Sequence, residues 1–323
     1  MEKEEEPPRP RNATRSTVVG PRRAVTLVAT TVLGILLLFL LLDPAQAPAP
    51  IAPLVEQDAD EPLDYAPVEA TLVADVRSVH AGETFHVGVL LRMRPGWHVF
   101  WKDPGEAGLP TLVDLRVPAD FGLGTLRWPT PGGFRQPDDL IGYGYSDWVL
   151  LGATVEPPAE LAMDREVPVR ARAEWLTCER TCEPGEADLE LLLPVGGDRS
   201  PTDAEELFAS WERRLPVASD APDRPLSVAV AREAEGDVTT RYEVLLRWLE
   251  PPESIEWFPV AIADLELLQA QPSSSSTTRL SFLTMRLTAT TEVHGELDSV
   301  LAYTDALGVR RGVELAIPLT GPP

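Results

Sequence analysis

Residues 167–195, VPVRARAEWLTCERTCEPGEADLELLLPV, carry the clearest secondary-structure pattern in the chain. From Val167 to Trp175 apolar residues alternate with polar or charged ones, which is the period of a β-strand with one buried face. Residues 189–195 show the same alternation through three leucines and a valine. We therefore predict two strands joined by a tight connection, with Cys178 ending the first strand and Cys182 preceding the second.

Similar short segments at residues 68–76 and 85–91 extend the pattern, and the 33 prolines of the chain argue against long helices. An antiparallel β-sandwich is predicted for residues 67–196. Strand patterns resume at 226–230, 242–248, 280–282 and 313–317, which predicts a second, smaller β domain over 222–321. Residues 271–278, QPSSSSTT, are expected to form a flexible loop within it.

One helix is predicted in the connecting segment 197–221. Ser200 can cap it and Pro201 suits its first position, with acidic residues favouring the positive end of the helix dipole. An apolar stripe continues to Leu215, and the helix is expected to end before Pro216. The fold class is therefore all-β, with one helix between the two β domains.

Residues 24–42, AVTLVATTVLGILLLFLLL, are nineteen uncharged and mostly apolar residues, enough for a helix of about 28 Å across the ~30 Å hydrocarbon core of a bilayer. Arginines precede this segment and acidic residues follow it, so residues 1–23 are predicted to be cytoplasmic and the bulk of the chain external. A cleaved signal peptide is the alternative, because residues 45–47 imitate a cleavage site. The length of the apolar run and Pro48 favour a retained anchor, followed by a Pro-rich acidic linker over 43–66. Both readings place the cysteines in an oxidising compartment.

The formal net charge is −23, and residues 1–23 hold six basic residues against four glutamates, so the exported part carries about −25. This charge disfavours nucleic acid and anionic lipid as partners of the soluble part.

The two cysteines are candidates for redox chemistry. A loop this short restrains the unfolded chain weakly, by roughly 2 kcal/mol, so a purely structural staple gains little. Four glutamates crowd the pair with only Arg180 opposing them, which raises thiol pKa values and suits a disulfide that a partner's thiolate attacks. A structural disulfide and a Cu(I) site remain alternatives. Zinc would need two further ligands with local spacing, and none is present.

Aromatic motifs supply further candidates. Residues 96–105, GWHVFWKDPG, contain His98 and Trp101, and residues 142–145, GYGY, contain Tyr143 and Tyr145. Core packing explains these residues, and the alternative is a cap or docking surface around the cysteines, with His98 as a proton carrier. Trp175, three residues before Cys178, joins this possible rim. The sequence predicts no cofactor and no metal ligands.

Taken in order, these motifs resemble a known family. They are Gly96-Trp97-His98, Asp103-Pro104-Gly105, Gly108-Leu109-Pro110, residues 128–131 (WPTP), residues 142–145 and the segment from Trp175 to Ala187. The pattern resembles the amino-terminal periplasmic domain of the thiol:disulfide interchange protein DsbD, closest to the copper-sensitivity suppressor branch. Residues 257–259 (WFP) and 308–319 resemble the second domain of that branch.

The resemblance implies an immunoglobulin-like domain in which Cys178 and Cys182 are the redox pair. In the family, electrons arrive from cytoplasmic thioredoxin through a multi-helix membrane domain and a thioredoxin-like domain. This chain has one predicted membrane helix and neither of those domains, so exchange would depend on a partner and enzyme activity of its own is left open.

The expected partners are a thioredoxin-like or multi-helix membrane electron donor and envelope client disulfides, in cytochrome maturation, disulfide correction or copper tolerance. The expected location is the bacterial inner membrane, with the bulk of the chain periplasmic. A copper-handling or non-catalytic interaction module is the alternative.

Overall fold

The computed structural model describes residues 66–319, except 137–138, 164, 198–201, 235–238, 263–264, 275–278 and 290–294. The described residues belong to one compact unit, Tyr65–Pro323. The predicted cytoplasmic segment 1–23, the membrane segment 24–42 and nearly all of the linker 43–66 lie outside them. Within the described part, no helix is long and apolar enough to cross a membrane.

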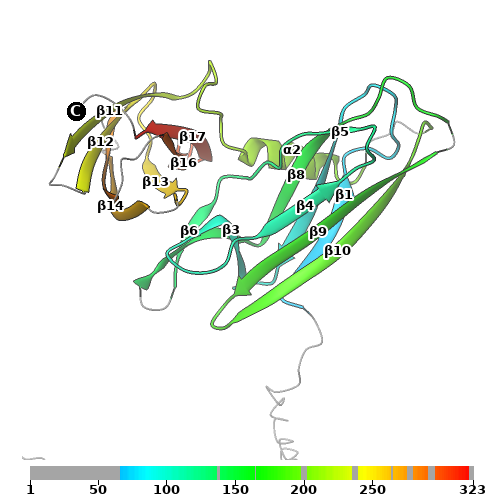
Figure 1. Cartoon of the computed structure of the whole chain (residues 1–323), viewed down its shortest axis with the longest axis horizontal. Helices are drawn as coiled ribbons and strands as arrows, with labels where there is room; N and C mark the ends of the chain where they lie inside the picture. The colour runs from blue at the N-terminus through cyan, green and yellow to red at the C-terminus, as the bar shows by residue number, and fades with distance from the viewer. Residues whose placement is uncertain are drawn as a thin grey trace, which may run out of the picture. The chain divides into compact units, whose positions relative to one another are not determined.

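Two antiparallel sheets form the first half of this unit. One has the strand order β1-β2-β8-β5, and the other has the order β10-β9-β3-β7-β6 with β4 also paired to β9. The first sheet comprises β1 (Val68–Ala74), β2 (Phe85–Met93), β8 (Trp148–Glu156) and β5 (Gly122–Leu123). The second comprises β10 (Cys182–Pro194), β9 (Glu166–Cys178), β3 (His98–Gly105), β7 (Ile141–Ser146), β6 (Gly132–Arg135) and β4 (Leu112–Arg116). In Figure 1, β9 and β10 run side by side as a long hairpin.

The alternation in residues 167–175 has the predicted result. Val167, Val169 and Ala173 are fully buried in the core of the first half, whereas Arg170 and Arg172 are exposed. The core lies between the two sheets, since β2 and β8 contribute Val89 and several other inward-facing residues to the same cluster. Burial of this apolar surface is the main favourable contribution to folding.

Helix α2 (Glu205–Arg214) covers the opposite face of the β2–β8 pair, and Figure 1 shows it beside β8. Trp211 is fully buried and packs so closely on Gly152 that a Cβ added there would lie 3.1 Å from the indole. The predicted start of the helix is wrong. Its N-cap residue is Ala204, because the hydroxyl of Thr202 accepts a hydrogen bond from the backbone N–H of Ala204 and forms a separate turn. Ser200 and Pro201 lie outside the described residues.

Seven further strands form two smaller sheets in the second half. The order of one is β11-β12-β15-β14 and that of the other is β13-β16-β17. The strands are β11 (Leu226–Ala234), β12 (Thr239–Trp248), β15 (Leu280–Ala289), β14 (Leu265–Ser274), β13 (Ser254–Pro259), β16 (Glu296–Thr304) and β17 (Arg310–Pro318). The predicted loop over 271–278 is wrong for residues 271–274, which continue β14 because they pair with β15. Residues 275–278 lie outside the described part.

The two halves are joined by specific contacts as well as by the chain. The buried carboxylate of Asp103 accepts hydrogen bonds from the backbone N–H groups of Ala261, at 2.6 Å, and Gly105, at 2.9 Å. The rings of Tyr143 and Phe258 meet edge to face at 5.1 Å. Phe258 also belongs to the core of the first half, so the end of β13 is packed into it.

Candidate functional site

The two cysteines form a disulfide that closes the β9–β10 hairpin. Cys178 is the last residue of β9 and Cys182 is the first residue of β10, and they face each other directly across the ladder. The sulfur atoms are 2.03 Å apart and the Cα atoms 4.1 Å apart. As predicted, the pair brackets a tight connection, which consists of residues 179–181. This connection lies at the margin of the sheet, because β10 is an edge strand.

The two cysteines differ in exposure. Cys178 is 3% exposed, because β9 is flanked by β10 and β3, whereas Cys182 is exposed on the edge strand. A thiolate that approaches from solvent therefore meets Cys182 first. Attack on that sulfur leaves the electron pair of the broken bond on the buried Cys178.

His98 lies beside the buried cysteine. It is the cross-strand neighbour of Cys178 on β3, so the two side chains share one face of the sheet. Its ring packs 3.9 Å from the ring of Phe134, centroid to centroid, and 5.5 Å from that of Phe100. The enclosed Nε2 of His98 has no hydrogen-bond partner among the described residues. Burial lowers the pKa of His98, so the imidazole is neutral near pH 7 and carries one N–H.

The electrostatic prediction for the turn needs a correction. Arg172 binds three carboxylates on the outer face of the hairpin, those of Glu174 at 2.8 Å, Glu186 at 2.7 Å and Asp188 at 3.0 Å. Arg180 pairs with Glu179 at 3.2 Å. Arg172 lies six residues before Cys178 in the sequence, so the local charge pattern of the turn does not include it. The strand register nevertheless puts it directly opposite Asp188. The turn is thus acidic but less so than the neighbouring sequence suggests.

The other predicted rim residues are distributed over three environments. Trp101 and Tyr145 lie in the core, where the Tyr145 hydroxyl donates to the carbonyl oxygen of Pro129 at 2.7 Å. Burial raises the pKa of Tyr145 well above its ordinary value. Tyr143 packs against Phe258 instead of the turn, and burial with nearby carboxylates raises its pKa to about 12. Trp175 is buried near the hairpin end, and its indole lies over Gly185.

A groove adjoins the disulfide on the outer side of the hairpin, with a volume of about 630 Å³. The apolar residues that line it are Leu109, Pro110, Leu112, Trp175, Leu176 and Pro184. Sequence reasoning missed Leu112 and Phe134 as residues of this region. No local signal marks them, because β4 and β6 reach the site only through strand pairing.

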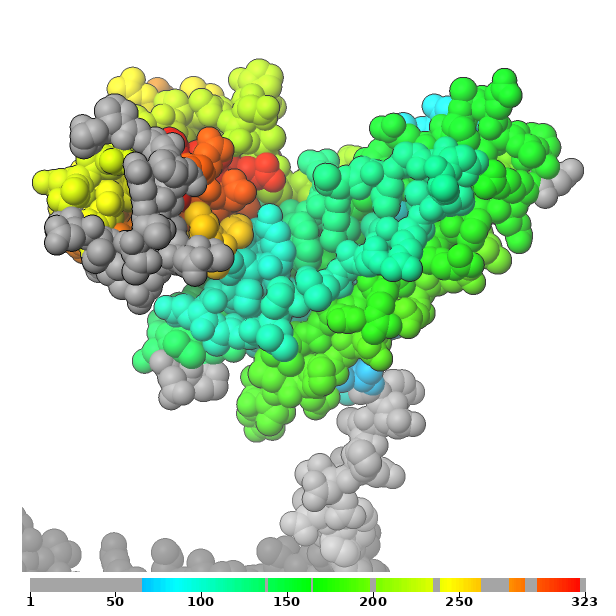
Figure 2. Space-filling view, viewed as in Figure 1, coloured from blue at the N-terminus to red at the C-terminus, as the bar shows by residue number. Residues whose placement is uncertain are grey.

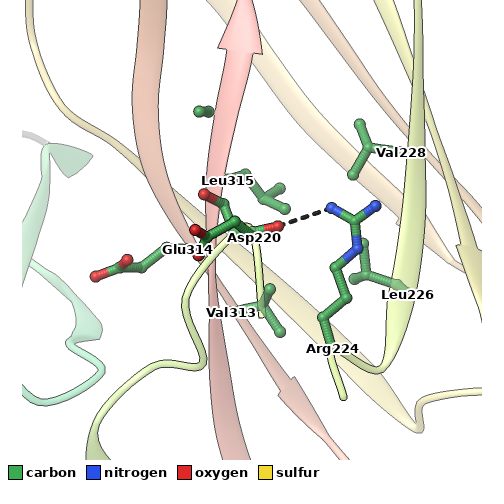
Figure 3. A pocket seen from close by; sticks show the side chains of 9 residues that line it. Asp220, Arg224, Leu226, Val228, Val313, Glu314 and Leu315 are labelled. Atoms are coloured by element: carbon green, nitrogen blue, oxygen red, sulfur yellow. Dashed lines mark hydrogen bonds between the residues drawn. The ribbon is translucent and has the colours of Figure 1, made fainter. Parts of the chain in front are cut away.

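A second pocket, of about 260 Å³, lies in the other half of the unit between β17 and the segment before β11. Figure 3 shows the guanidinium of Arg224, which donates to the carbonyl oxygen of Ser219 at 2.7 Å. Its lining is aliphatic and charged, without cysteine or histidine. No group of three or more His, Cys, Asp and Glu side chains suited to a metal ion occurs in the part of the chain that the structure describes.

The sequence of the first half matches a family model. Residues 66–194 match the model described as thiol:disulfide interchange protein DsbD, N-terminal. This part of the chain is therefore similar in sequence to a DsbD amino-terminal domain. The matched residues include both cysteines and His98, so the disulfide lies within the part of the chain that resembles this family. The search of curated proteins gives no match.

Among solved structures, the N-terminal periplasmic domain of ScsB from Proteus mirabilis is similar, with a TM-score of 0.55 and 18% identity, covering 79% of this chain and 95% of that chain. At this identity the likeness shows the fold alone. A protein of unknown function from Porphyromonas gingivalis W83 has a TM-score of 0.22 and 10% identity, covering 78% of this chain and 100% of that chain. Bovine butyrophilin has a TM-score of 0.18 and 11% identity, covering 78% and 100%. TM-scores of 0.22 and 0.18 do not establish a shared fold with these two proteins.

Proposed function

We propose that the chain is a thiol–disulfide exchange protein that acts through Cys178 and Cys182. It accepts reducing equivalents from a thioredoxin-like or multi-helix membrane donor and passes them to disulfides of envelope client proteins. The observation that carries the proposal is the disulfide at an edge turn of a domain similar in sequence to a DsbD amino-terminal domain, with Cys182 exposed and Cys178 buried. A disulfide whose only role was to hold the hairpin closed would not need a solvent-accessible sulfur.

The exchange proceeds in two displacement steps. A thiolate of the donor attacks Sγ of Cys182, a mixed disulfide forms, and the electron pair of the broken bond goes to Sγ of Cys178, which takes up a proton. The donor's second thiolate then attacks the donor's first sulfur, which is bonded to Sγ of Cys182 in the mixed disulfide. The donor leaves with a disulfide, and Cys182 takes up the second proton. The donor has lost two electrons and the pair has gained them, and the same steps in reverse reduce a client disulfide.

His98 supports the first displacement. The leaving sulfur is that of Cys178, and the neutral imidazole lies on the neighbouring strand at the same level of the ladder. An imidazole N–H that donates to the forming thiolate lowers its free energy, and a better-stabilised leaving thiolate departs faster. Phe134 and Phe100 confine the ring, so its orientation is fixed before the bond opens.

Residues 24–42 hold the protein in the bacterial inner membrane, with residues 1–23 in the cytoplasm and the described part in the periplasm. The apolar length of this segment and the arginines before it support this topology. A reporter active only outside the cytoplasm, fused after residue 66, should be active in the membrane fraction. Activity only in a soluble, shortened product would contradict the anchor.

Cysteine replacement tests the exchange itself. Cys178→Ser keeps the exposed thiol and removes the one that resolves a mixed disulfide, so it should trap envelope proteins in reductant-sensitive complexes. Cys182→Ser keeps only the buried thiol and should trap far less. The wild-type disulfide should also open in dithiothreitol without unfolding. A folded protein whose bond resists dithiothreitol, or tight Cu(I) binding by the reduced thiols with no trapped partner, would contradict the exchange function.

A further inference from the structure

The lining of the groove reaches to within two residues of each cysteine of the disulfide. Leu176 and Pro184 face each other across the β9–β10 ladder, and each lies two residues from a cysteine. Residues two apart on a strand share a face and are about 7 Å from each other. A segment whose sulfur bonds to Cys182 therefore passes the mouth of the groove. Figure 2 shows β9 and β10 in green, next to the segment that leads into β4.

The walls of the groove are apolar and exposed. Leu109 is 60% exposed and Leu112 is 56% exposed, and these are the two most exposed leucines in the described part of residues 66–197. Both belong to the segment at the start of β4, which pairs with β9. Large apolar side chains exposed side by side next to a reactive bond are typical of a surface that a partner covers.

The rim of the groove and the turn are acidic. Five carboxylates and two arginines surround them, which gives a formal net charge of −3; the acidic residues are Glu174, Glu179, Glu183, Glu186 and Asp188. Because the whole chain carries −23, a second copy of it would meet this rim with like charge. A partner with basic residues beside its cysteine complements the rim.

We propose that the groove binds an apolar side chain next to the reactive cysteine of a partner protein, while a Lys or Arg of the same segment faces the acidic rim. This inference rests on the proposed function and adds a criterion for partner choice. A small dithiol reaches Cys182 without using the groove. Partner proteins are therefore distinguished by the residues around their cysteines and not by thiol reactivity alone.

Two synthetic dithiol peptides with equal thiol pKa values test the inference, one with Leu and Lys beside the attacking cysteine and the other with Ser and Glu. The measured quantity is the second-order rate constant for reduction of the Cys178–Cys182 disulfide, with dithiothreitol as the reference. The Leu/Lys peptide should react about tenfold faster, as expected for transfer of one leucine side chain out of water. High salt should reduce the part of this advantage that comes from charge.

The double variant Leu109→Ser/Leu112→Ser should bring the two peptide rates to within about threefold, since most of the apolar contact is then lost. Leu192→Ser is the matched control, because Leu192 is 50% exposed on β10 at the far end of the hairpin. Dithiothreitol should reduce all three proteins equally. Equal rates of the two peptides with the wild-type protein would overturn this inference. So would a rate advantage of the Leu/Lys peptide that persists in the double variant. Neither result would contradict the proposed function. Failure of dithiothreitol to open the bond would overturn the proposed function together with it.

Discussion

His98 faces Cys178 across the β3–β9 ladder, and the hydroxyl of Thr177 donates to the His98 carbonyl oxygen at 3.0 Å, which ties the two strands together at this point. The buried sulfur thus has an imidazole as its neighbour on one side and its disulfide partner on the other. The charged groups of the adjacent turn are Glu179, Arg180 and Glu183, all exposed. Burial alone lowers the pKa of His98, so none of these charges determines its protonation state.

Replacement of His98 by Phe should raise the pKa of the Cys178 thiol. Loss of an N–H donor next to the thiolate corresponds to about one pKa unit. Reduction of the disulfide by small thiols should slow about threefold, given a Brønsted coefficient near one half. The thiol pKa can be read from thiolate absorbance in the Cys182→Ser protein. His98→Gln keeps an N–H donor and should preserve most of the effect, whereas an unchanged thiol pKa in His98→Phe would rule out this role.

Gly185 should not tolerate alanine. A Cβ at this position would lie 2.4 Å from Nε1 of Trp175, its cross-strand neighbour. The indole would have to move, and overpacking of this kind costs about 1–3 kcal/mol of unfolding free energy. Urea titration of Gly185→Ala measures the loss. Gly132→Ala is the control, because the nearest atom to a Cβ there is 3.9 Å away, and equal stability of both variants would contradict the packing argument.

The contact between His86 and Asp75 should make stability depend on pH. The main cause that raises the pKa of His86 is the hydrogen bond that its Nδ1–H donates to the carboxylate of Asp75, at 2.8 Å; Glu212 also raises it, while burial and Arg127 lower it. A raised pKa means that the folded state binds the proton more tightly. The stabilisation is therefore complete below the unfolded pKa of about 6.5 and is lost as the pH rises through the folded value.

Comparison of the wild-type protein with His86→Gln tests this dependence. The wild-type free energy of unfolding should fall relative to that of the variant between pH 6 and pH 8, and the change should be small because the pair is partly exposed to solvent. Denaturant titrations at both pH values give the difference. Parallel pH curves for the two proteins would show that the Asp75 contact does not stabilise protonated His86 in solution.

Asp103 should be essential for the contact between the two halves of the unit. Its carboxylate is buried and accepts two backbone N–H groups, including that of Ala261. Asp103→Ala removes the acceptor of both partly buried N–H groups, and loss of a hydrogen bond to a charged group costs about 1.5–3 kcal/mol of unfolding free energy. Faster hydrogen exchange at the Ala261 amide is the specific signal. Asp114→Ala, at an exposed carboxylate, is the control and should leave that amide protected.

The parts of the fold that depend on local patterns could be predicted from the sequence. Alternation from Val167 to Trp175 identified β9, and its end at Cys178 placed one sulfur at the edge of the turn. The apolar stripe around Trp211 identified the helix, although the turn made by Thr202 set its start. These features need only the periodicity of a strand or a helix and the chemistry of neighbouring residues.

The parts that depend on strand register could not be predicted. Arg172 reaches Asp188, and Phe134 reaches His98, only because of which residues face each other across the sheets. Residues 271–274 (QPSS) lack strand-forming side chains and include a proline, yet they pair as part of β14, which is an edge strand where a proline is tolerated. Core packing is the first interpretation of Tyr145 from the sequence, and the pairing of β7 with β3 is what directs its side chain there.

Strand β3 has His98 at one end and Asp103 near the other, so the same eight residues pair with the buried Cys178 and contact the second half of the chain. Cutting the polypeptide after residue 221 would remove the Ala261 N–H from Asp103 and uncover Tyr143 of β7, which packs on Phe258 in the intact chain. Such a fragment would expose apolar surface, and its Asp103 carboxylate would keep only the backbone N–H of Gly105 as a partner. Redox measurements on a shortened protein would therefore describe a molecule whose surface near the disulfide domain differs from that of the intact chain.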